Sequence, residues 1–118
     1  MSGMLTLSVR QPWAWMIIHG DKDIENRTWT TRVRGPVLIH ASGGCTRREY
    51  DEASDFAFGR HGGCIWENYP KFEHLQRGGI VGQVEIVDCV SQSDSPWFIG
   101  PVGFVLRNAM PLAWRPMR

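Results

Sequence analysis

Residues 7–29 read LSVRQPWAWMIIHGDKDIENRTW, and this stretch carries a strand, a helix and a second strand in close succession. Alternating apolar residues over positions 4–9 predict a short strand. Pro12 then stands where the first turn of a helix tolerates a proline, and apolar residues recur at helical spacing over residues 11–19, ahead of a terminating glycine. The alternation over residues 24–30 predicts the second strand.

Strand and helix patterns alternate along the rest of the chain as well. Strands are predicted over residues 37–41, 80–90 and 103–107, and the last of these could extend toward residue 112. Thr46, with Glu49 three residues later, has the spacing of a capping box, which predicts a helix that ends near residue 58. We therefore expect an α+β fold, a small and mostly antiparallel β-barrel with two or three short helices. Such barrels commonly bind ligands at an open end or in a groove beside the sheet.

Size and composition indicate one folded domain over residues 1–118. The chain has 118 residues, enough for one hydrophobic core, and its apolar content of 42% and charged content of 21% are those of a folded protein. The longest apolar run, near residues 13–18, is far below the roughly 20 residues that span a bilayer, and no signal peptide opens the chain. We therefore expect a cytoplasmic protein with no membrane partner.

The formal net charge is +1. Because this charge gives no overall field for a long polyanion, a nucleic-acid site must come from local clusters of Arg and Lys.

The cysteines do not form a disulfide framework. Cys45, Cys64 and Cys89 cannot all pair within one chain, so we interpret them as reduced thiols. Cys64 lies close to His61, and Cys45 and His74 are further residues of the types that zinc prefers. A second closely spaced pair is missing, so we expect neither a metal nor another cofactor.

Three charged residues are predicted to converge at the start of the second strand. On a strand that begins at Ile24, Glu25 and Arg27 point to one face and Ile24 and Asn26 to the other, while Lys22 lies in the turn before it. Together the Lys, Glu and Arg can bind a phosphate, hydrogen-bond a base edge or change one another's proton affinity. The alternative is a structural ion pair in which Glu25 holds a neighbouring cation in place.

Several aromatic side chains could stack on a nucleobase. Trp97 lies in a loop rich in Ser, Pro and Gly, where it either stacks at the barrel mouth or caps the core. Trp29, next to the charged strand, is a better surface candidate than Trp13, which falls on the apolar face of the first helix.

Two segments together resemble the ASCH family, whose members are similar in fold to RNA-binding PUA domains. These are LSVRQPWA at residues 7–14 and GDKDIENRTW at residues 20–29, and DCVS at 88–91 and SDSP at 93–96 are similar to coactivator members. The resemblance implies a PUA-like barrel and a nucleic-acid or nucleotide binding module, with single-stranded RNA, DNA or a modified nucleoside as partner. The expected ligand-binding residues are Lys22, Glu25, Arg27, Ser8, Arg10, Gln11, Trp29 and Trp97.

The resemblance also implies an alternative enzymatic function. Some small members of the family are amidohydrolases of acylated cytidines that use a lysine, a threonine three positions later and an acidic residue. Lys22 is present, but Glu25 stands at the threonine position and has no hydroxyl to act as nucleophile. Glu25 could instead serve as general base for water, with Lys22 stabilising the oxyanion and Asp94 as a third catalytic residue. A ribonuclease in the same cleft and a protein-interaction accessory domain are further alternatives.

Overall fold

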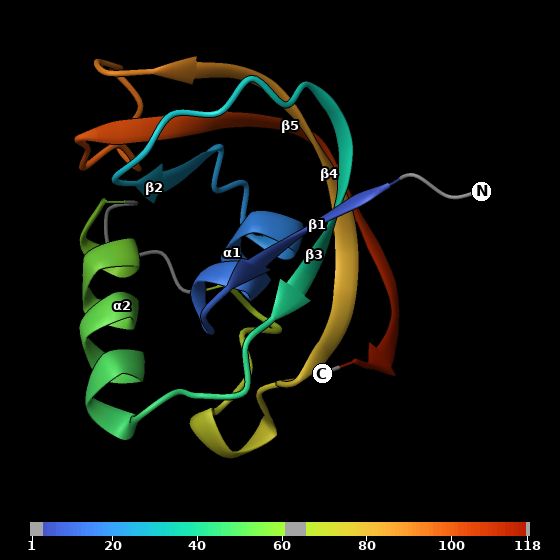
Figure 1. Ribbon diagram of the computed structural model, residues 1–118. Coiled ribbons are helices and arrows are strands. Elements are labelled where there is room, and N and C mark those ends of the chain that lie inside the picture. The colour runs from blue at the N-terminus through green and yellow to red at the C-terminus, as the bar shows by residue number, and fades with distance from the viewer. Residues whose placement is uncertain (1–3, 61–65, 118) are drawn as a thin grey trace.

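The computed structural model describes residues 4–60 and 66–117. Five strands form one curved sheet in the order β1-β3-β4-β5-β2, which wraps into a half-barrel (Figure 1). The strands are β1 (Leu5–Val9), β2 (Ile24–Arg27), β3 (Gly35–Ala41), β4 (Gly79–Val90) and β5 (Val102–Pro116). β1 pairs with β3 in parallel, and the other three pairs are antiparallel. The predicted α+β class and mostly antiparallel sheet are confirmed.

Two α-helices accompany the sheet. Helix α1 (Trp13–His19) lies in its hollow and contacts β3, β4 and β5, while α2 (Arg47–Arg60) stands on the open side, across α1 from the sheet (Figure 1). A single 3₁₀ turn, η1 (Phe72–His74), follows them in the chain. None of the helices within residues 4–60 and 66–117 is long and apolar enough to span a bilayer.

The helix starts follow local sequence chemistry. Pro12 occupies the N-cap position of α1, so the helix itself begins at Trp13, slightly later than predicted. The capping box of α2 is confirmed: Thr46 N donates to Glu49 Oε1 over 2.8 Å, and Glu49 N donates to Thr46 Oγ1 over 3.1 Å. Each helix therefore begins at a residue that the sequence marks.

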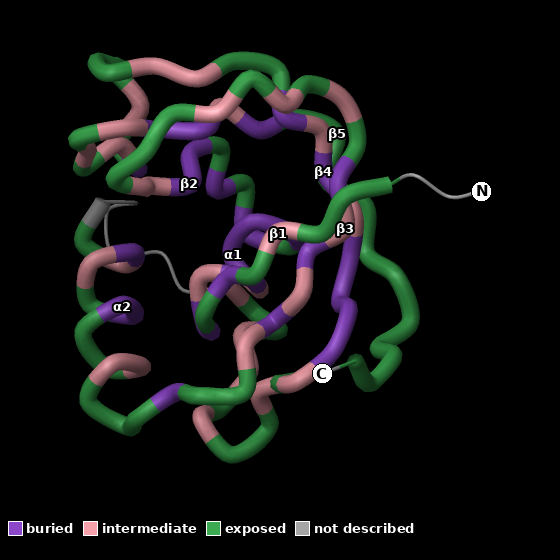
Figure 2. Tube along the Cα trace, in the orientation of Figure 1, coloured by how far each residue is buried: buried purple, intermediate pink, exposed green. Residues whose placement is uncertain are grey.

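Buried residues, purple in Figure 2, lie along α1 and along the strands that surround it. The main core cluster joins residues of α1 to inward-facing residues of the strands, among them Ile17, Ile39, Val84 and Phe104. A second cluster, centred on Met16, extends this core toward α2. α1 is therefore buried on the faces toward both the sheet and α2.

Two strands differ in length from their predictions. β2 is predicted to reach residue 30 but ends at Arg27, because its last partner, Val102, is the first residue of β5. β5 is longer than predicted and runs to Pro116, because the long β4 provides partners as far as Gly79. The outer half of β5 has exposed side chains throughout, so alternating hydrophobicity could not reveal it.

Candidate functional site

The predicted charged segment lies where the two edges of the sheet meet. β1 and β2 are the first and last strands in the sheet order, so each has one edge without a strand partner in the described chain. Arg27 Nη2, on β2, donates to the carbonyl oxygen of Ser8, on β1, over 2.5 Å. We call this junction the seam of the half-barrel; it is closed by a side chain instead of a strand ladder.

Glu25 lies between two cations at the seam. Its Oε2 accepts from Arg27 Nε over 3.1 Å, and Arg27 Nη2 is 3.0 Å from the same oxygen. Its Oε1 lies 3.4 Å from Lys22 Nζ. The predicted alternation along β2 is confirmed, since Ile24 packs in the core while Glu25 and Arg27 share the other face. The three charged groups therefore come together.

Lys22 is far more buried than expected, with 2% of its side chain exposed. The backbone N of Lys22 donates to Met16 O at the end of α1, which draws the turn beneath the helix. Lys22 Nζ also donates to Ile24 O, a carbonyl that faces away from β5 in the antiparallel ladder, and lies 5.4 Å from the ring centroid of Trp13. Lys22 therefore contacts Glu25 from the buried side of the site.

Burial also sets the electrostatics of Lys22. Removal from water lowers the pKa of Lys22 from its ordinary value, and the nearby carboxylate of Glu25 opposes this change.

Above Glu25 and Arg27 the surface opens into a groove of about 300 Å³. Trp29 forms one wall with 55% of its surface exposed, and the Cζ of Arg27 lies 5.3 Å from its ring centroid. A guanidinium and an aromatic ring thus face the same space, an arrangement that suits both a phosphate and a base. The groove is lined by Ser8, Val9, Arg10, Trp13, Glu25, Asn26, Arg27, Thr28 and Trp29.

A second hollow, of about 310 Å³, adjoins this groove because both are lined by Arg10 and Trp13. Glu49, Glu52 and Phe56 of α2 form its far side. Arg10 Nη2 donates to Glu49 Oε1 over 2.7 Å, so its charge is shared with α2. The groove and this second hollow together extend from Arg27, at the basic end, to the carboxylates and the aromatic ring of α2 at the other end.

Trp97 requires a correction. The sequence left open whether its ring stacks on a ligand or belongs to the core, and the structure places it in the core with 2% exposure. The ring packs 6.3 Å from Trp66 and 6.3 Å from Phe56, measured between centroids. With so little of its surface accessible, Trp97 presents no ring face to a base, and the predicted stacking role does not apply.

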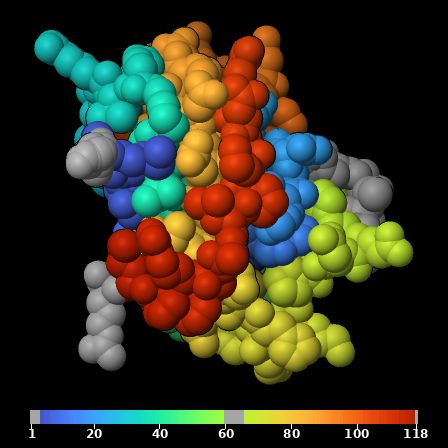
Figure 3. Space-filling model, turned by 90° about the vertical axis from the view of Figure 1, so that its right-hand side faces the viewer, coloured from blue at the N-terminus to red at the C-terminus, as the bar shows by residue number. Residues whose placement is uncertain are grey.

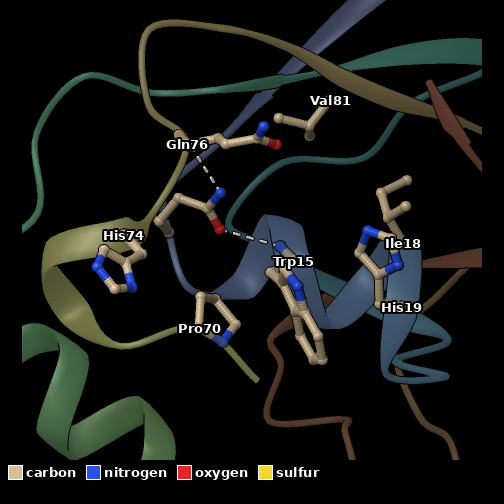
Figure 4. A pocket seen from close by; sticks show the side chains of 8 residues that line it. Trp15, Ile18, His19, Pro70, His74, Gln76 and Val81 are labelled. Carbon is tan, nitrogen blue, oxygen red and sulfur yellow. Dashed lines mark hydrogen bonds between the residues drawn. The ribbon is translucent and has the colours of Figure 1, made fainter. Parts of the chain in front are cut away.

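Gln11 is also buried, and both ends of its amide are engaged. Its Nε2 donates to Gln76 O over 2.8 Å, and its Oε1 accepts from Trp15 N over 3.0 Å, the two bonds dashed in Figure 4. These bonds hold the start of α1 to the chain ahead of β4. Gln11 also lines a separate hollow of about 170 Å³. The other residues that line it are Trp15, Ile18, His19, Pro70, His74, Gln76 and Val81.

The other candidate residues that the structure describes do not line the groove. Asp94 is exposed in the loop after β4, and it is not among the described residues that line the groove. Cys45 and Cys89 are free cysteines, as predicted. His61 and Cys64 lie outside the described residues, and within residues 4–60 and 66–117 no three His, Cys, Asp or Glu side chains gather in a metal-binding arrangement.

Sequence reasoning missed Asn26, which has no charge or aromatic ring to mark it. Its Nδ2 donates to Trp97 O over 3.0 Å, and its Oδ1 accepts from the backbone N of Ile99 and Gly100 over 2.8 and 3.0 Å. Asn26 thereby anchors the loop before β5 to the strand that carries Glu25 and Arg27.

Comparisons with known proteins identify the family of this chain. The ASCH domain family matches residues 7–98. Activating signal cointegrator 1 of Mus musculus is 34% identical over 91 residues, which cover 73% of this chain and 14% of that protein. The human protein of the same name is 33% identical over the same shares, so this chain spans about one seventh of the length of either relative. The chain belongs to the ASCH domain family.

Proposed function

We propose that this chain is a nucleic-acid binding module that holds single-stranded RNA in the groove at the seam. The proposal rests on one observation: Arg27 and the exposed ring of Trp29 lie together in the lining of a groove of about 300 Å³. The groove offers an aromatic face for an unpaired base and a guanidinium for phosphate, the two contacts that dominate recognition of single strands.

Glu25 and Lys22 have supporting roles in this proposal. Glu25 bonds Arg27 through Nε and Nη2, which fixes the guanidinium plane beneath Trp29. Lys22 pairs with the carboxylate of Glu25 on its buried side and offsets its charge, so that Glu25 does not repel an incoming phosphate. Arg10, which is paired with Glu49 and has half of its side chain exposed, extends the polar wall of the groove.

Trp29→Ala tests the proposal in a fluorescence anisotropy titration with a short labelled single-stranded RNA. Loss of one stacked base costs about 1 to 3 kcal/mol, so we expect affinity to fall by about 5-fold to 150-fold. The salt dependence should change little, because no phosphate contact is removed.

Trp114→Ala is the matched control, because Trp114 is an exposed tryptophan on β5 that lines a different hollow. Equal losses for both variants, or no binding by the unmodified chain, would contradict the proposal. Single-stranded DNA and duplex RNA of the same length, titrated alongside, test for recognition of the 2′-hydroxyl and of unpaired bases.

The hydrolase alternative can be assayed in the same preparation with acylated cytidines. Lys22 is not among the described residues that line the groove, so stabilisation of an oxyanion by its ammonium has no direct path in this geometry. Turnover that disappears in Lys22→Ala, but persists in a control such as Lys71→Ala on the exposed surface, would favour the hydrolase over the binding module.

A further inference from the structure

Ser8 lines the groove proposed for RNA, but its hydroxyl forms a pair with the imidazole of His40 that the proposed function does not use. β1 and β3 run parallel, and Ser8 is in register with His40. Because residues in register across a sheet project to the same face, their side chains meet. Ser8 Oγ lies 3.1 Å from His40 Nδ1.

A third group fixes which imidazole nitrogen carries the proton. His40 Nε2 lies 2.6 Å from the carbonyl oxygen of Met117, at the far end of the chain. A carbonyl oxygen can only accept, so Nε2 carries the proton and donates to Met117 O. In the neutral ring Nδ1 is then the acceptor, and the hydroxyl of Ser8 donates to it.

This arrangement has the three parts of an activated nucleophile: a hydroxyl, a base within hydrogen-bond distance, and a group that orients the base. The hydroxyl is also accessible, because Ser8 is exposed. Ser8 lines the seam groove together with Arg10 and Arg27. Guanidinium groups near a reacting carbonyl stabilise the negative charge that develops on its oxygen.

We propose that Ser8 is an acyl-accepting nucleophile, with His40 as its general base, and that the chain hydrolyses carboxylic esters through an acyl-Ser8 intermediate. Ser8 Oγ attacks the carbonyl carbon while its proton moves to His40 Nδ1. The tetrahedral adduct collapses as the bond to the leaving oxygen breaks, and that oxygen takes the proton from Nδ1 to leave as an alcohol. Water then attacks the acyl group by the same route, releasing the acid and restoring Ser8.

The test uses the full chain and a simple activated ester, p-nitrophenyl acetate, which needs no nucleotide group. Intact-mass spectrometry with peptide mapping should find the acetyl group on Ser8, and release of nitrophenol should continue past one equivalent. Ser8→Ala should abolish both signals. His40→Gln should slow turnover by about 100-fold or more, the usual contribution of a general base.

Matched controls separate this chemistry from general surface reactivity. Ser93→Ala removes an exposed serine whose hydroxyl accepts a backbone hydrogen bond, and His74→Gln removes an exposed imidazole; neither should change the rate. Acetyl groups found on other side chains and not on Ser8, or full turnover in Ser8→Ala, would overturn the proposal.

A second measurement applies if either Ser8 or His40 variant fails to fold. The unmodified chain is treated with a phosphonofluoridate, which reacts with activated serines, in buffer and in concentrated urea. Labelling of Ser8 in the folded chain and its loss in urea support the proposal. Equal labelling in both states contradicts it, because unfolding separates Ser8 from His40. Failure of RNA binding would leave these outcomes unaffected, since neither reagent uses a nucleotide.

Discussion

At the scale of single residues, the site depends on how the cost of burying Lys22 is offset. An ammonium removed from water is unfavourable unless it is paired, and the structure supplies the carboxylate of Glu25 and the carbonyl of Ile24. Burial nevertheless remains the largest influence on Lys22 and lowers its pKa. The folded chain therefore binds the proton of Lys22 less tightly than the unfolded chain does.

This lowered pKa predicts a pH dependence of stability. Between the lowered value and the ordinary value of 10.5, the unfolded chain binds more protons than the folded chain, so the free energy of unfolding rises with pH. Relative to Lys22→Met, the unmodified chain should therefore gain stability as the pH rises toward 10.5. Urea unfolding of both proteins across this interval measures the difference, in which the contributions of the tyrosines cancel. A difference that is flat or falls with pH would contradict the prediction.

At the scale of elements, the short β2 is held by more than its ladder with β5. Asn26 bonds three backbone groups of the loop before β5, so the strand with the charged residues and the loop with Trp97 are one unit. The ring of Trp97 packs in the second core cluster with Met16 and Ile24. This connection gives Glu25 and Arg27 a rigid base.

Asn26→Ala should therefore destabilise the chain by about 2 kcal/mol, because it leaves three backbone groups without their partner. Asn26→Asp is the matched comparison, since it keeps the accepting oxygen for Ile99 and Gly100 but loses the donor to Trp97 O. At a pH low enough to protonate the new carboxyl, its O–H can donate to Trp97 O again, so the loss of stability there should be smaller than in Asn26→Ala. Chemical unfolding followed by tryptophan fluorescence measures both. Equal stability of Asn26→Ala and the unmodified chain would show that the loop is held by its packing alone.

At the scale of the whole molecule, the half-barrel is unevenly covered. α1 fills its hollow, but the outer half of β5 is exposed on both faces and carries Met110, Leu112 and Trp114 at its surface. In Figure 3 this part of β5, in red, runs along the face of the molecule beside β4. Beyond Leu106, β5 has no partner on the side away from β4 among the described residues. Pro111 and Pro116 interrupt the row of N–H groups along this stretch, which limits pairing with other chains.

Hydrogen exchange should follow this uneven coverage. Amides of α1 and of the β3–β4 pair, which surround the main core cluster, should exchange most slowly, while those of residues 107–116 should exchange much faster because little packing opposes local opening. Mass spectrometry of peptides from an exchange time course measures the order. Slow exchange along residues 107–116 would instead indicate that this surface is covered in solution, for example by a second copy of the chain.

The sequence by itself determined much of the framework. The period of its apolar residues located β1, α1, β3 and β4, and the Thr46–Glu49 spacing located the start of α2. These patterns act over a few residues, where backbone geometry and capping chemistry leave few choices. The alternation along β2 also placed Glu25 and Arg27 on one face, because strand geometry alone requires it.

The tertiary structure decided which of those side chains meet solvent. Lys22 and Trp97 are polar or aromatic groups in loops, and nothing local distinguishes a buried one from an exposed one; Lys22 is drawn beneath α1 by its backbone bond to Met16 O, and Trp97 is enclosed by the rings of Phe56 and Trp66. The contacts of Ser8 with Arg27 and His40 likewise join residues 19 and 32 positions apart. The contact with His40 arises from the pairing of β1 with β3. The contact with Arg27 arises where the two edge strands of the sheet meet, which depends on the curvature of all five strands.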